Sequence, residues 1–363
     1  MTDDRIAAAR LVLGNYVEPY LGIPLGEAKA VKSVRLEGDR VLAEVELGFP
    51  AGRFASARAR ELEGLLRADP AVGEASVSVV WRVLAHPVQG QLEALPGIRN
   101  VIAVASGKGG VGKSTTAVNL ALALALDGAR VGLLDADIYG PSQPRMLGVH
   151  GEKPTSRDGR KIEPIEALGI KIMSIGFLVD EEQPMVWRGP MVTQALTQLL
   201  GETNWGELDY LIVDMPPGTG DIQLTLSQRV PVSGAVIVTT PQDIALLDAR
   251  KGLRMFQKVA IPVLGVVENM SVHVCSKCGH EEPIFGQGGG AVMAGQYGVA
   301  LLAQLPLDIR IRAETDGGRP TVVADPDGPI GRAYLEMARR TAARLALNAA
   351  QPTAFPKISV EES

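Results

Sequence analysis

The stretch from Gly107 to Thr115 is rich in glycine and contains two lysines. Four of its residues have the spacing G-x-x-x-x-G-K-S/T, namely Gly107, Gly112, Lys113 and Ser114. In such a loop the glycines let backbone N–H groups face a triphosphate, the lysine reaches the outer phosphates, and the hydroxyl binds Mg²⁺. The pattern predicts a site for ATP and Mg²⁺, with Ser114 as a magnesium ligand. The residues expected to contact the nucleotide are Gly107, Gly109, Gly110, Val111, Gly112, Lys113, Ser114 and Thr115.

The segments on either side of this loop support the prediction. Residues 100–105 form a short apolar run typical of a buried parallel strand, and residues 116–124 have the composition of a helix packed on both sides. The loop would then join a strand to a helix whose N-terminus adds positive potential at the phosphates. A glycine-rich turn with incidental lysines would not explain this context.

Lys108 is one lysine more than such a loop needs, because Lys113 already occupies the position that contacts the β- and γ-phosphates. It is either a solvated surface lysine or a residue with a separate role. The string from Gly107 to Thr115 resembles the deviant Walker A motif, K-G-G-x-G-K-S/T, of the MinD and ParA class of ATPases. The resemblance implies a homodimer in which Lys108 touches the phosphates bound by the other subunit. There it would stabilise phosphoryl transfer, as an arginine finger does.

Two carboxylates follow a second apolar run. Asp135 and Asp137 come directly after residues 130–134, at the strand end where open α/β sheets bind ligands. We expect Asp137 to orient the attacking water and Asp135 to support the Mg²⁺ shell. The alternative is that both side chains only cap a turn.

A third apolar run, at 209–213, ends in Asp214 and continues as Met215-Pro216-Pro217-Gly218-Thr219-Gly220-Asp221. This arrangement resembles a Walker B aspartate followed by a switch loop. Asp214 would bind Mg²⁺ through water, and the backbone of Gly218 would sense the γ-phosphate. ATP binding and hydrolysis would then be coupled to the position of the loop, whereas the alternative is a rigid turn closed by Asp214.

Cys275 and Cys278 are the only cysteines of the chain, so a site with four thiolates cannot form within one subunit. A C-x-x-C pair serves as a redox disulfide, as half of a zinc site or as half of an iron–sulfur site. Two subunits related by a two-fold axis would supply four thiolates, which suit a 4Fe–4S cluster or Zn²⁺ equally by ligand count. His273 and His280 offer a further alternative, a Cys₂His₂ zinc site within one chain. A plain loop with two unligated thiols also remains open.

The composition excludes little but favours a protein without membrane or nucleic-acid partners. The formal net charge is −5 over 363 residues, and the basic residues are scattered rather than clustered. No apolar run reaches the length of a membrane span, and the N-terminus lacks a signal pattern. We therefore expect a cytoplasmic protein.

The patterns along the chain predict two domains. Residues 1–85 are expected to form a small α+β domain with an antiparallel hairpin at 31–47. Residues 86–98 contain proline and glycine and are expected to be a linker. From 99 to 347 apolar strands alternate with helices, which is typical of a mostly parallel sheet covered on both faces, an α/β fold. The polar tail at 348–363 is expected to be disordered.

The elements expected within these parts have the following ranges. In the small domain they are a helix within 6–17, a helix at 55–67 and a strand at 75–81. In the larger domain the strands are expected at 101–105, 130–134, 170–175, 209–213, 234–239, 262–267 and 301–305. The helices there are expected at 190–200, 220–228, 243–257, 289–297 and 328–346.

Several strings together resemble the Mrp/ApbC family of iron–sulfur cluster carrier ATPases, over nearly all of the chain. Besides the loop at 107–115 they are Asp135 to Ser142, Trp187-Arg188-Gly189-Pro190-Met191, Asp214 to Asp221, Glu268-Asn269-Met270-Ser271 running into the C-x-x-C pair, and Ile284-Phe285-Gly286. The resemblance implies a MinD-like P-loop fold and a homodimer that binds ATP and holds a 4Fe–4S cluster between two C-x-x-C pairs. Its partners would be apo iron–sulfur client proteins and a cluster-assembly scaffold. Asn269 resembles the asparagine that reads the adenine ring, whereas Trp187 and Arg188 have no mechanism that follows from their types.

The N-terminal part resembles the small cluster-assembly domain often fused ahead of Mrp proteins, with one departure. Where that domain commonly carries a reactive cysteine after its second strand, this chain has Gly48-Phe49-Pro50-Ala51-Gly52. The domain therefore supplies no thiolate, and docking or partner recognition is the expected role.

Two other functions fit parts of the sequence. A MinD- or ParA-like positioning ATPase would need a basic surface for membrane or DNA; the last helix has Arg339, Arg340 and Arg344, but a polar tail with Glu361 and Glu362 follows. A metal-trafficking ATPase for zinc or nickel would use the same cysteines. For the carrier we expect slow hydrolysis, because Lys108 would act only after the dimer closes.

Overall fold

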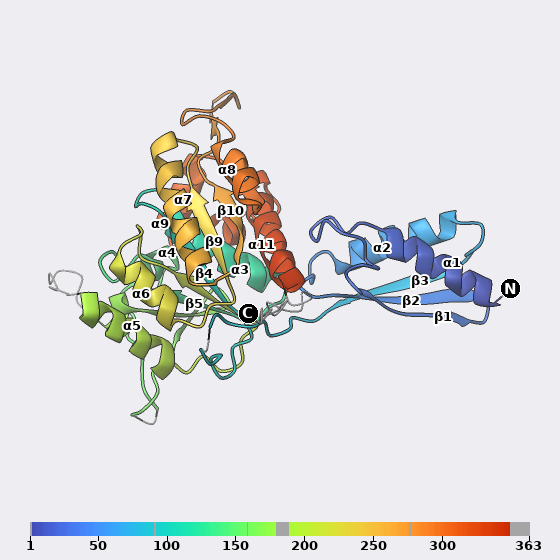
Figure 1. Cartoon of the computed structure of the whole chain (residues 1–363), viewed down its shortest axis with the longest axis horizontal. Coiled ribbons are helices and arrows are strands. Elements are labelled where there is room, and N and C mark those ends of the chain that lie inside the picture. Colours follow the sequence, from blue (N-terminus) through green and yellow to red (C-terminus); the bar gives the residue numbers. More distant parts are fainter. Residues whose placement is uncertain (1, 91, 158, 179–188, 276, 349–363) are drawn as a thin grey trace, which may run out of the picture.

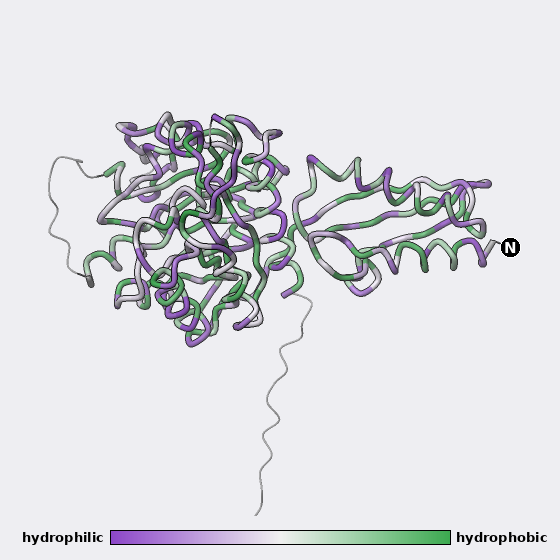
Figure 2. Tube along the Cα trace, turned by 90° about the horizontal axis from the view of Figure 1, so that it is seen from above, coloured by the Kyte–Doolittle hydropathy of each residue, from purple (hydrophilic) through white to green (hydrophobic). Residues whose placement is uncertain are grey.

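Figure 1 shows the computed structural model of the chain, which describes residues 2–90, 92–157, 159–178, 189–275 and 277–348. The chain forms a small N-terminal lobe and a larger lobe. Hydrophobic residues run along the strands of the small lobe and through the larger one (Figure 2). The two lobes contain separate sheets, of three and eight strands.

The small lobe has two helices on one face of its three-stranded sheet (Figure 1). Its elements are α1 (Thr2–Asn15), β1 (Val31–Glu37), β2 (Arg40–Leu47), α2 (Ala55–Ala68) and β3 (Ala75–Trp81). Strands β1 and β2 pair antiparallel across a turn in which Gly38 has a φ of 59°, as expected from the alternating sequence. Strand β3 pairs with β2 in parallel after the crossover helix α2, which buries Leu62 and Leu66.

The larger lobe is built on an eight-stranded sheet in the order β13-β10-β9-β4-β8-β5-β7-β6. In that order the strands are Ala300–Gln304, Val263–Glu268, Gly234–Thr239, Val101–Ser106, Tyr210–Asp214, Val131–Asp135, Ile170–Ser174 and Ile165–Ala167. All pairings are parallel except that of the edge strand β6 with β7. Every residue of β4, β5, β8 and β9 is buried, because helices cover both faces of a parallel sheet.

Two layers of helices cover this sheet. Three helices pack together on one face: α3 (Lys113–Leu126), α10 (Thr321–Ala324) and α11 (Pro329–Asn348). The other face carries α5 (Gly189–Glu202), α6 (Asp221–Arg229), α7 (Asp243–Lys258) and α8 (Gly289–Tyr297). The connections hold the shorter helices α4 (Gln143–Met146) and α9 (Ile309–Asp316) and the 3₁₀ turn η1 (Ile175–Phe177).

The expected α/β fold class is confirmed, and the predicted strands and most of the predicted helices agree with the structure to within about two residues. Two helices begin earlier than expected: α1 begins at Thr2 rather than Ile6, and α3 begins at Lys113 rather than Thr116. Several short elements were not expected: β6, α4, α9, α10 and a hairpin of β11 (His273–Val274) with β12 (Glu281–Glu282). All but α9 have four residues or fewer per helix or strand, too few to show a period in the sequence, and α9, with eight residues, has no clear apolar face. Among the described residues, no helix is both long and apolar enough to span a bilayer.

The small lobe contacts the C-terminal end of α3, the helix that follows the phosphate loop. Arg339 of α11 makes two hydrogen bonds to Asp127, at 2.7 Å from Nε to Oδ2 and 2.9 Å from Nη2 to Oδ1. Its guanidinium also lies 4.7 Å from the ring centroid of Phe54 and donates to the hydroxyl of Tyr20. The Gly52 N–H donates to the Asp127 carbonyl at 2.9 Å. Residues 48–52, where the related domain commonly carries a cysteine, thus contact the larger lobe. Arg339, one of the arginines considered for a basic surface, is bonded within the chain instead.

The segment expected to be a linker is partly fastened to the larger lobe. His86 is buried and its backbone N–H donates to Asn100 Oδ1 at 3.1 Å. Gln89 is also buried, and its amide donates to the carbonyls of Ser227 and Val230 and accepts from the Val232 N–H. These bonds fix the chain just before β4. Of the tail expected at 348–363, Asn348 is the last residue of α11, and residues 349–363 lie outside the described residues.

Candidate functional site

The phosphate loop lies between β4 and α3, at the C-terminal edge of the sheet. Two of its glycines are required by close neighbours. A Cβ at Gly107 would lie 2.1 Å from the backbone carbon of Asp248 in α7. A Cβ at Gly112, which has a φ of 81°, would lie 2.1 Å from the Asn269 amide nitrogen. The loop therefore sits directly against α7 and the end of β10, with no room for side chains there.

Lys113 is buried and its Nζ forms an ion pair with Oδ1 of Asp214, at the end of the neighbouring strand β8. The same nitrogen lies 3.1 Å from the Ser114 hydroxyl. The structure thus brings together the three residues predicted to contact the outer phosphates and Mg²⁺. Two of the three ammonium hydrogens are thus engaged within the chain, and the contact of Lys113 with phosphate oxygens stays a prediction.

Asp135 is completely buried at the end of β5 and is held by the loop that follows it. Its Oδ2 accepts hydrogen bonds from the backbone N–H groups of Ser142 and Gln143 and from the Ser174 hydroxyl, at 3.0–3.2 Å. Its Oδ1 accepts from the Asp137 N–H at 3.2 Å. Burial, followed by the charge of Asp214, raises the pKa of Asp135 to about 7. In this arrangement Asp135 organises the loop, and its place in the Mg²⁺ shell stays a prediction.

Asp137 and Lys108 line the same cavity of about 220 Å³ beside the phosphate loop. The other residues around it are Ser106, Gly109, Gly110, Gly112, Lys113, Ser114, Thr115, Ser142, Met146 and Pro217. Burial raises the pKa of Asp137, while the nearby Lys113 opposes this shift. A half-buried carboxylate with a raised pKa in a phosphate-binding cavity is suited to accept a proton or orient a water. Lys108 is half-buried, and its carbonyl accepts from the Ser106 hydroxyl.

Two groups that were predicted to contact the nucleotide form hydrogen bonds within the chain in this structure. The Gly218 N–H, expected to sense the γ-phosphate, donates to the Ser106 carbonyl at 3.0 Å. The Asn269 amide, expected to read adenine, donates to the Val111 carbonyl of the phosphate loop at 2.9 Å. Both residues therefore hold the loop in shape in this state, and their contacts with a nucleotide stay predictions. Trp187 and Arg188 lie outside the described residues.

One polar residue of this site has no counterpart in the sequence-based prediction. Gln143, the first residue of α4, is completely buried, and its side-chain amide donates to Asp214 Oδ2 at 2.8 Å and to the Ser114 carbonyl at 3.0 Å. Its carbonyl Oε1 and the hydroxyl of Ser142 have no hydrogen-bond partner within the described structure, although both atoms are buried. The only sequence feature that points to Gln143 is its position directly after the segment from Asp135 to Ser142.

The donor set fits a magnesium ion. Hydroxyl and carboxylate oxygens are ligands that Mg²⁺ prefers. The waters that Mg²⁺ keeps need oxygen atoms to which they can donate hydrogen bonds. Ser114 and Asp214 would hold the ion, and Ser142 Oγ and Gln143 Oε1 are oxygens that its waters would donate to. When bound, Mg²⁺ would neutralise charge on the β- and γ-phosphates.

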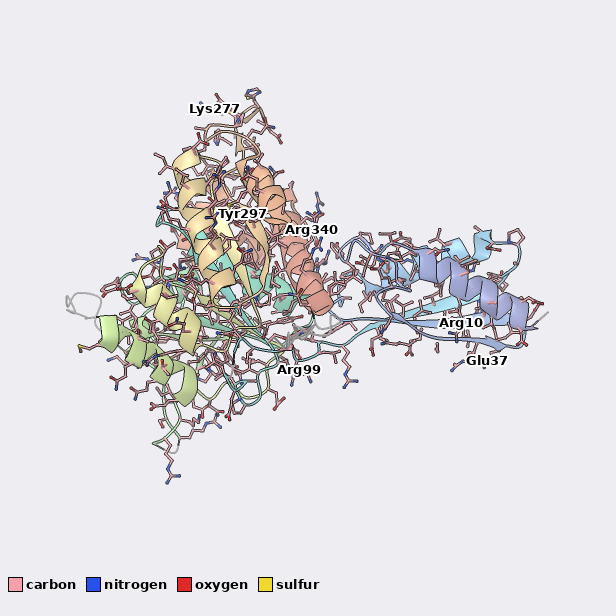
Figure 3. All side chains as sticks on the ribbon, in the orientation of Figure 1. Arg10, Glu37, Arg99, Lys277, Tyr297 and Arg340 are labelled. Carbon is pink, nitrogen blue, oxygen red and sulfur yellow. The ribbon has the colours of Figure 1, made fainter. Side chains whose placement is uncertain are left out.

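Cys275 and Cys278 lie on the short hairpin of β11 and β12, which projects beyond α8 with Lys277 at its tip (Figure 3). The Cys275 N–H donates to the His280 carbonyl, the Gly279 N–H donates to the Cys275 carbonyl, and Gly279 has a φ of 72°. Backbone N–H groups of Lys277 and Cys278, and then the Cys278 thiol, lower the pKa of the Cys275 thiol. A tight turn that directs N–H groups at sulfur favours thiolate ligands for a metal.

The thiols lack further ligands within the described part of one chain, which contains no group of three or more His, Cys, Asp or Glu side chains placed to hold a metal ion. His273 is turned to the Leu307 carbonyl, 3.2 Å from its Nδ1. The structure therefore does not assemble the Cys₂His₂ site that the sequence left open. It leaves a half-site of two thiols at an exposed position, with Cys278 exposed and Cys275 partly so.

Comparisons with known proteins agree with this geometry. The family model described as NUBPL iron-transfer P-loop NTPase matches residues 97–342, and that described as iron-sulfur cluster assembly protein matches residues 6–79. The chain is 50% identical to the iron-sulfur cluster carrier protein of Haemophilus influenzae over 345 residues, 95% of this chain and 93% of the relative. It is 62% identical to that of Pseudomonas fragi over 268 residues, 74% of this chain and 93% of the relative.

Solved structures show the same fold. A nucleotide-binding protein from Archaeoglobus fulgidus in complex with ADP is 37% identical, with a TM-score of 0.56, over 66% of this chain and 93% of that chain. The cell division ATPase MinD from Pyrococcus furiosus is 23% identical, with a TM-score of 0.51, over 66% of this chain and 97% of that chain, a likeness of fold alone. The phosphate loop and the two aspartates Asp135 and Asp214, which end neighbouring strands, agree with a family match that covers most of the chain. The chain therefore belongs to the NUBPL iron-transfer P-loop NTPase family.

Proposed function

We propose that the protein is an ATP-dependent carrier of iron–sulfur clusters that works as a homodimer. Two subunits would hold a 4Fe–4S cluster, the cargo, between their Cys275 and Cys278 pairs and pass it to apo-proteins. The observation that carries this proposal is the preformed hairpin with two thiols and, among the described residues of the same subunit, no third ligand. The names of the curated relatives support the nature of the cargo.

The position of the hairpin supports a single dimer face for nucleotide and cluster. The hairpin follows β10, and Lys108 follows β4, so both lie at the C-terminal edge of the sheet. Large apolar side chains around them are exposed to solvent: Ile244 by 70% and Leu247 by 53% on α7, Ile284 by 53% after the hairpin, and Val292 by 58% on α8. Exposed apolar residues on adjoining elements are typical of a surface that a protein partner covers.

A short path joins the phosphate loop to the hairpin. Asn269 holds the Val111 carbonyl of the loop and stands two residues before Ser271, whose N–H and hydroxyl both donate to the Leu305 carbonyl. The next residues lead into β11 and the cysteines. A nucleotide that moves Val111 would therefore change the base of the hairpin, which is how ATP would shift the dimer between holding and releasing its cargo.

For hydrolysis, Lys113 would bind the phosphates in its own subunit, Lys108 would reach across the dimer, and Asp137 would orient the attacking water. Because Lys108 acts only after closure, we propose that turnover by the isolated protein is slow. A fast rate in dilute protein would contradict this arrangement. We also place the protein in the cytoplasm.

The decisive experiment is anaerobic reconstitution with iron and sulfide, followed by measurement of iron, sulfide and absorbance. We expect about four irons per dimer, the content of one 4Fe–4S cluster, whereas about two would indicate a 2Fe–2S cluster, which four thiolates also bind. Cys275→Ser and Cys278→Ser should each abolish binding, whereas His273→Asn and His280→Asn should retain it. Iron binding that survives both cysteine substitutions would refute the assignment, and zinc in protein purified without oxygen would favour metal trafficking instead.

The dimer face is tested separately. Ile244→Asp should prevent ATP-dependent dimerisation in analytical ultracentrifugation, because it places a charge in the covered apolar surface. Leu11→Asp is the matched control, since Leu11 is 65% exposed on α1 in the small lobe. Equal behaviour of the two variants would remove this face from the proposal. ATP-dependent retention on liposomes or DNA would favour the positioning ATPase.

A further inference from the structure

We propose that Gln143 is a positioning residue for the magnesium site, which no sequence motif assigned. This inference rests on the proposed function, because it concerns how that nucleotide site holds its metal. Gln143 links three motifs through one residue: its backbone N–H donates to Asp135, and its side chain donates to Asp214 and to the backbone of Ser114.

The orientation of the Gln143 amide is set by its partners. Both hydrogens of Nε2 are used, one by a carboxylate oxygen of Asp214 and one by the Ser114 carbonyl. If the amide were reversed, its oxygen would face these two acceptors and no hydrogen bond would form. Oε1 must therefore point elsewhere, and it is buried without a hydrogen-bond partner in the described structure.

An unpartnered buried carbonyl costs free energy, so its presence beside a ligand site indicates a ligand that completes it. The Ser142 hydroxyl is unpartnered in the same way and lines the cavity next to the phosphate loop. Both oxygens adjoin the residues that would hold Mg²⁺. Since Mg²⁺ keeps several waters when protein side chains bind it, these waters supply the donors that the two oxygens lack.

Gln143 also accounts for how the Asp214 carboxylate would stay in place when a nucleotide binds. In this structure Asp214 has Lys113 on Oδ1 and Gln143 on Oδ2. When Lys113 moves to the phosphates, Gln143 remains as the group that keeps the Asp214 carboxylate in place. The same amide is bonded to Asp214 and to the backbone of Ser114. It therefore keeps the Asp214 carboxylate and the Ser114 hydroxyl at a fixed separation, at which both can hold the ion.

The test compares ADP binding with and without Mg²⁺, measured by calorimetry in magnesium and in EDTA. Gln143→Met keeps the length of the side chain and removes the amide. We expect it to lower the gain in ADP affinity that Mg²⁺ confers by about tenfold, the effect of losing one hydrogen bond to a charged group, and to leave the affinity in EDTA unchanged. Gln143→Asn, whose amide is one methylene shorter, should lower the gain in the same direction.

The matched control is Gln89→Met. Gln89 is another buried glutamine with a fully bonded amide, but it lies beside the start of β4, about 20 Å from the phosphate loop at the other end of that strand. It should lower the melting temperature and leave the magnesium gain as in the wild type. This separates loss of a buried amide from loss of a metal contact.

The outcomes are distinct. An unchanged magnesium gain in Gln143→Met, or an equal loss of ADP affinity in magnesium and EDTA, overturns the role of Gln143. In the wild-type protein, Mn²⁺ bound with ADP should broaden the side-chain amide signal of Gln143 in a nitrogen-15 spectrum and spare that of Gln89; an unbroadened Gln143 also overturns the role, even if the variants do not fold. A wild type that does not bind ADP would instead refute the proposed function.

Discussion

Replacing Arg339 by methionine should destabilise the protein strongly, because this arginine neutralises a buried carboxylate between the lobes. The side chain of Arg339 is 12% exposed and that of Asp127 is 2% exposed, and the two form paired hydrogen bonds. Asp127 is also the C-cap of α3, where a negative charge meets the negative end of the helix dipole. Arg339→Met leaves this charge buried without a cation.

Breaking a buried ion pair in this way costs about 3–5 kcal/mol. With 1 kcal/mol corresponding to about 2–4 °C, the lower bound predicts a fall in melting temperature of about 6–12 °C. The small lobe should also separate more readily, since Tyr20 and Phe54 lose their contact with the guanidinium. Thermal unfolding and small-angle scattering would measure the two effects.

The double variant Arg339→Met with Asp127→Leu identifies the cause. Removing both charges should recover a large part of the loss, because the unpaired carboxylate is gone. Arg332→Met is the control on the same helix, where the arginine is exposed and its side chain donates to the Asp327 carbonyl. A loss below about 1 kcal/mol in Arg339→Met, or a double variant no more stable than the sum of its parts, would refute the reasoning.

Three further predictions concern the nucleotide site. Lys108→Ala should lower ATP turnover roughly 10³-fold, as loss of a trans-acting cation does, and leave ADP binding unchanged; Lys153→Ala is the exposed control, and equal turnover in both variants would make Lys108 a surface lysine. Gly112→Ala should weaken ADP binding by about tenfold or more, because its positive φ and the Asn269 contact exclude a Cβ; calorimetry that finds wild-type affinity would contradict this. The pKa of Asp135 lies at about 7, above its unfolded value, so the folded state holds a proton that the unfolded state loses and the free energy of unfolding should fall as the pH rises from about 4 to 7. Urea titrations in EDTA should show a shallower fall for Asp135→Asn, which cannot ionise, and parallel curves would exclude this cause.

The parallel strands and the main helices were predictable because each is an apolar run or an amphipathic segment long enough to show its period. Strand β6 and the β11–β12 hairpin have three residues or fewer per strand, and only pairing with a neighbour defines them. The phosphate loop was predictable for a different reason, since its glycines and lysine have a fixed spacing.

Side-chain partners within the site were not predictable in the same way. The sequence places Asp135 at a strand end, but not that its oxygens are engaged by the loop from Asp137 to Gln143. Gln143 belongs to no pattern, and its role follows only from the three elements that meet there. Arg339 shows the same limit: in the sequence it is one of several arginines of a helix, whereas its burial on Asp127 depends on how the two lobes meet.

The contact of Gly52 with the end of α3 limits which residues relatives of this protein can have at three positions. A Cβ at position 52 would lie 2.7 Å from the Asp127 carbonyl, so this position admits no side chain while the lobes are joined. Relatives that keep the N-terminal domain should retain glycine at this position together with the partners at 127 and 339. In relatives without this domain the matching positions are free of the contact with the small lobe, and we expect the acid and the arginine to be replaced together, because either charge alone would lack its partner.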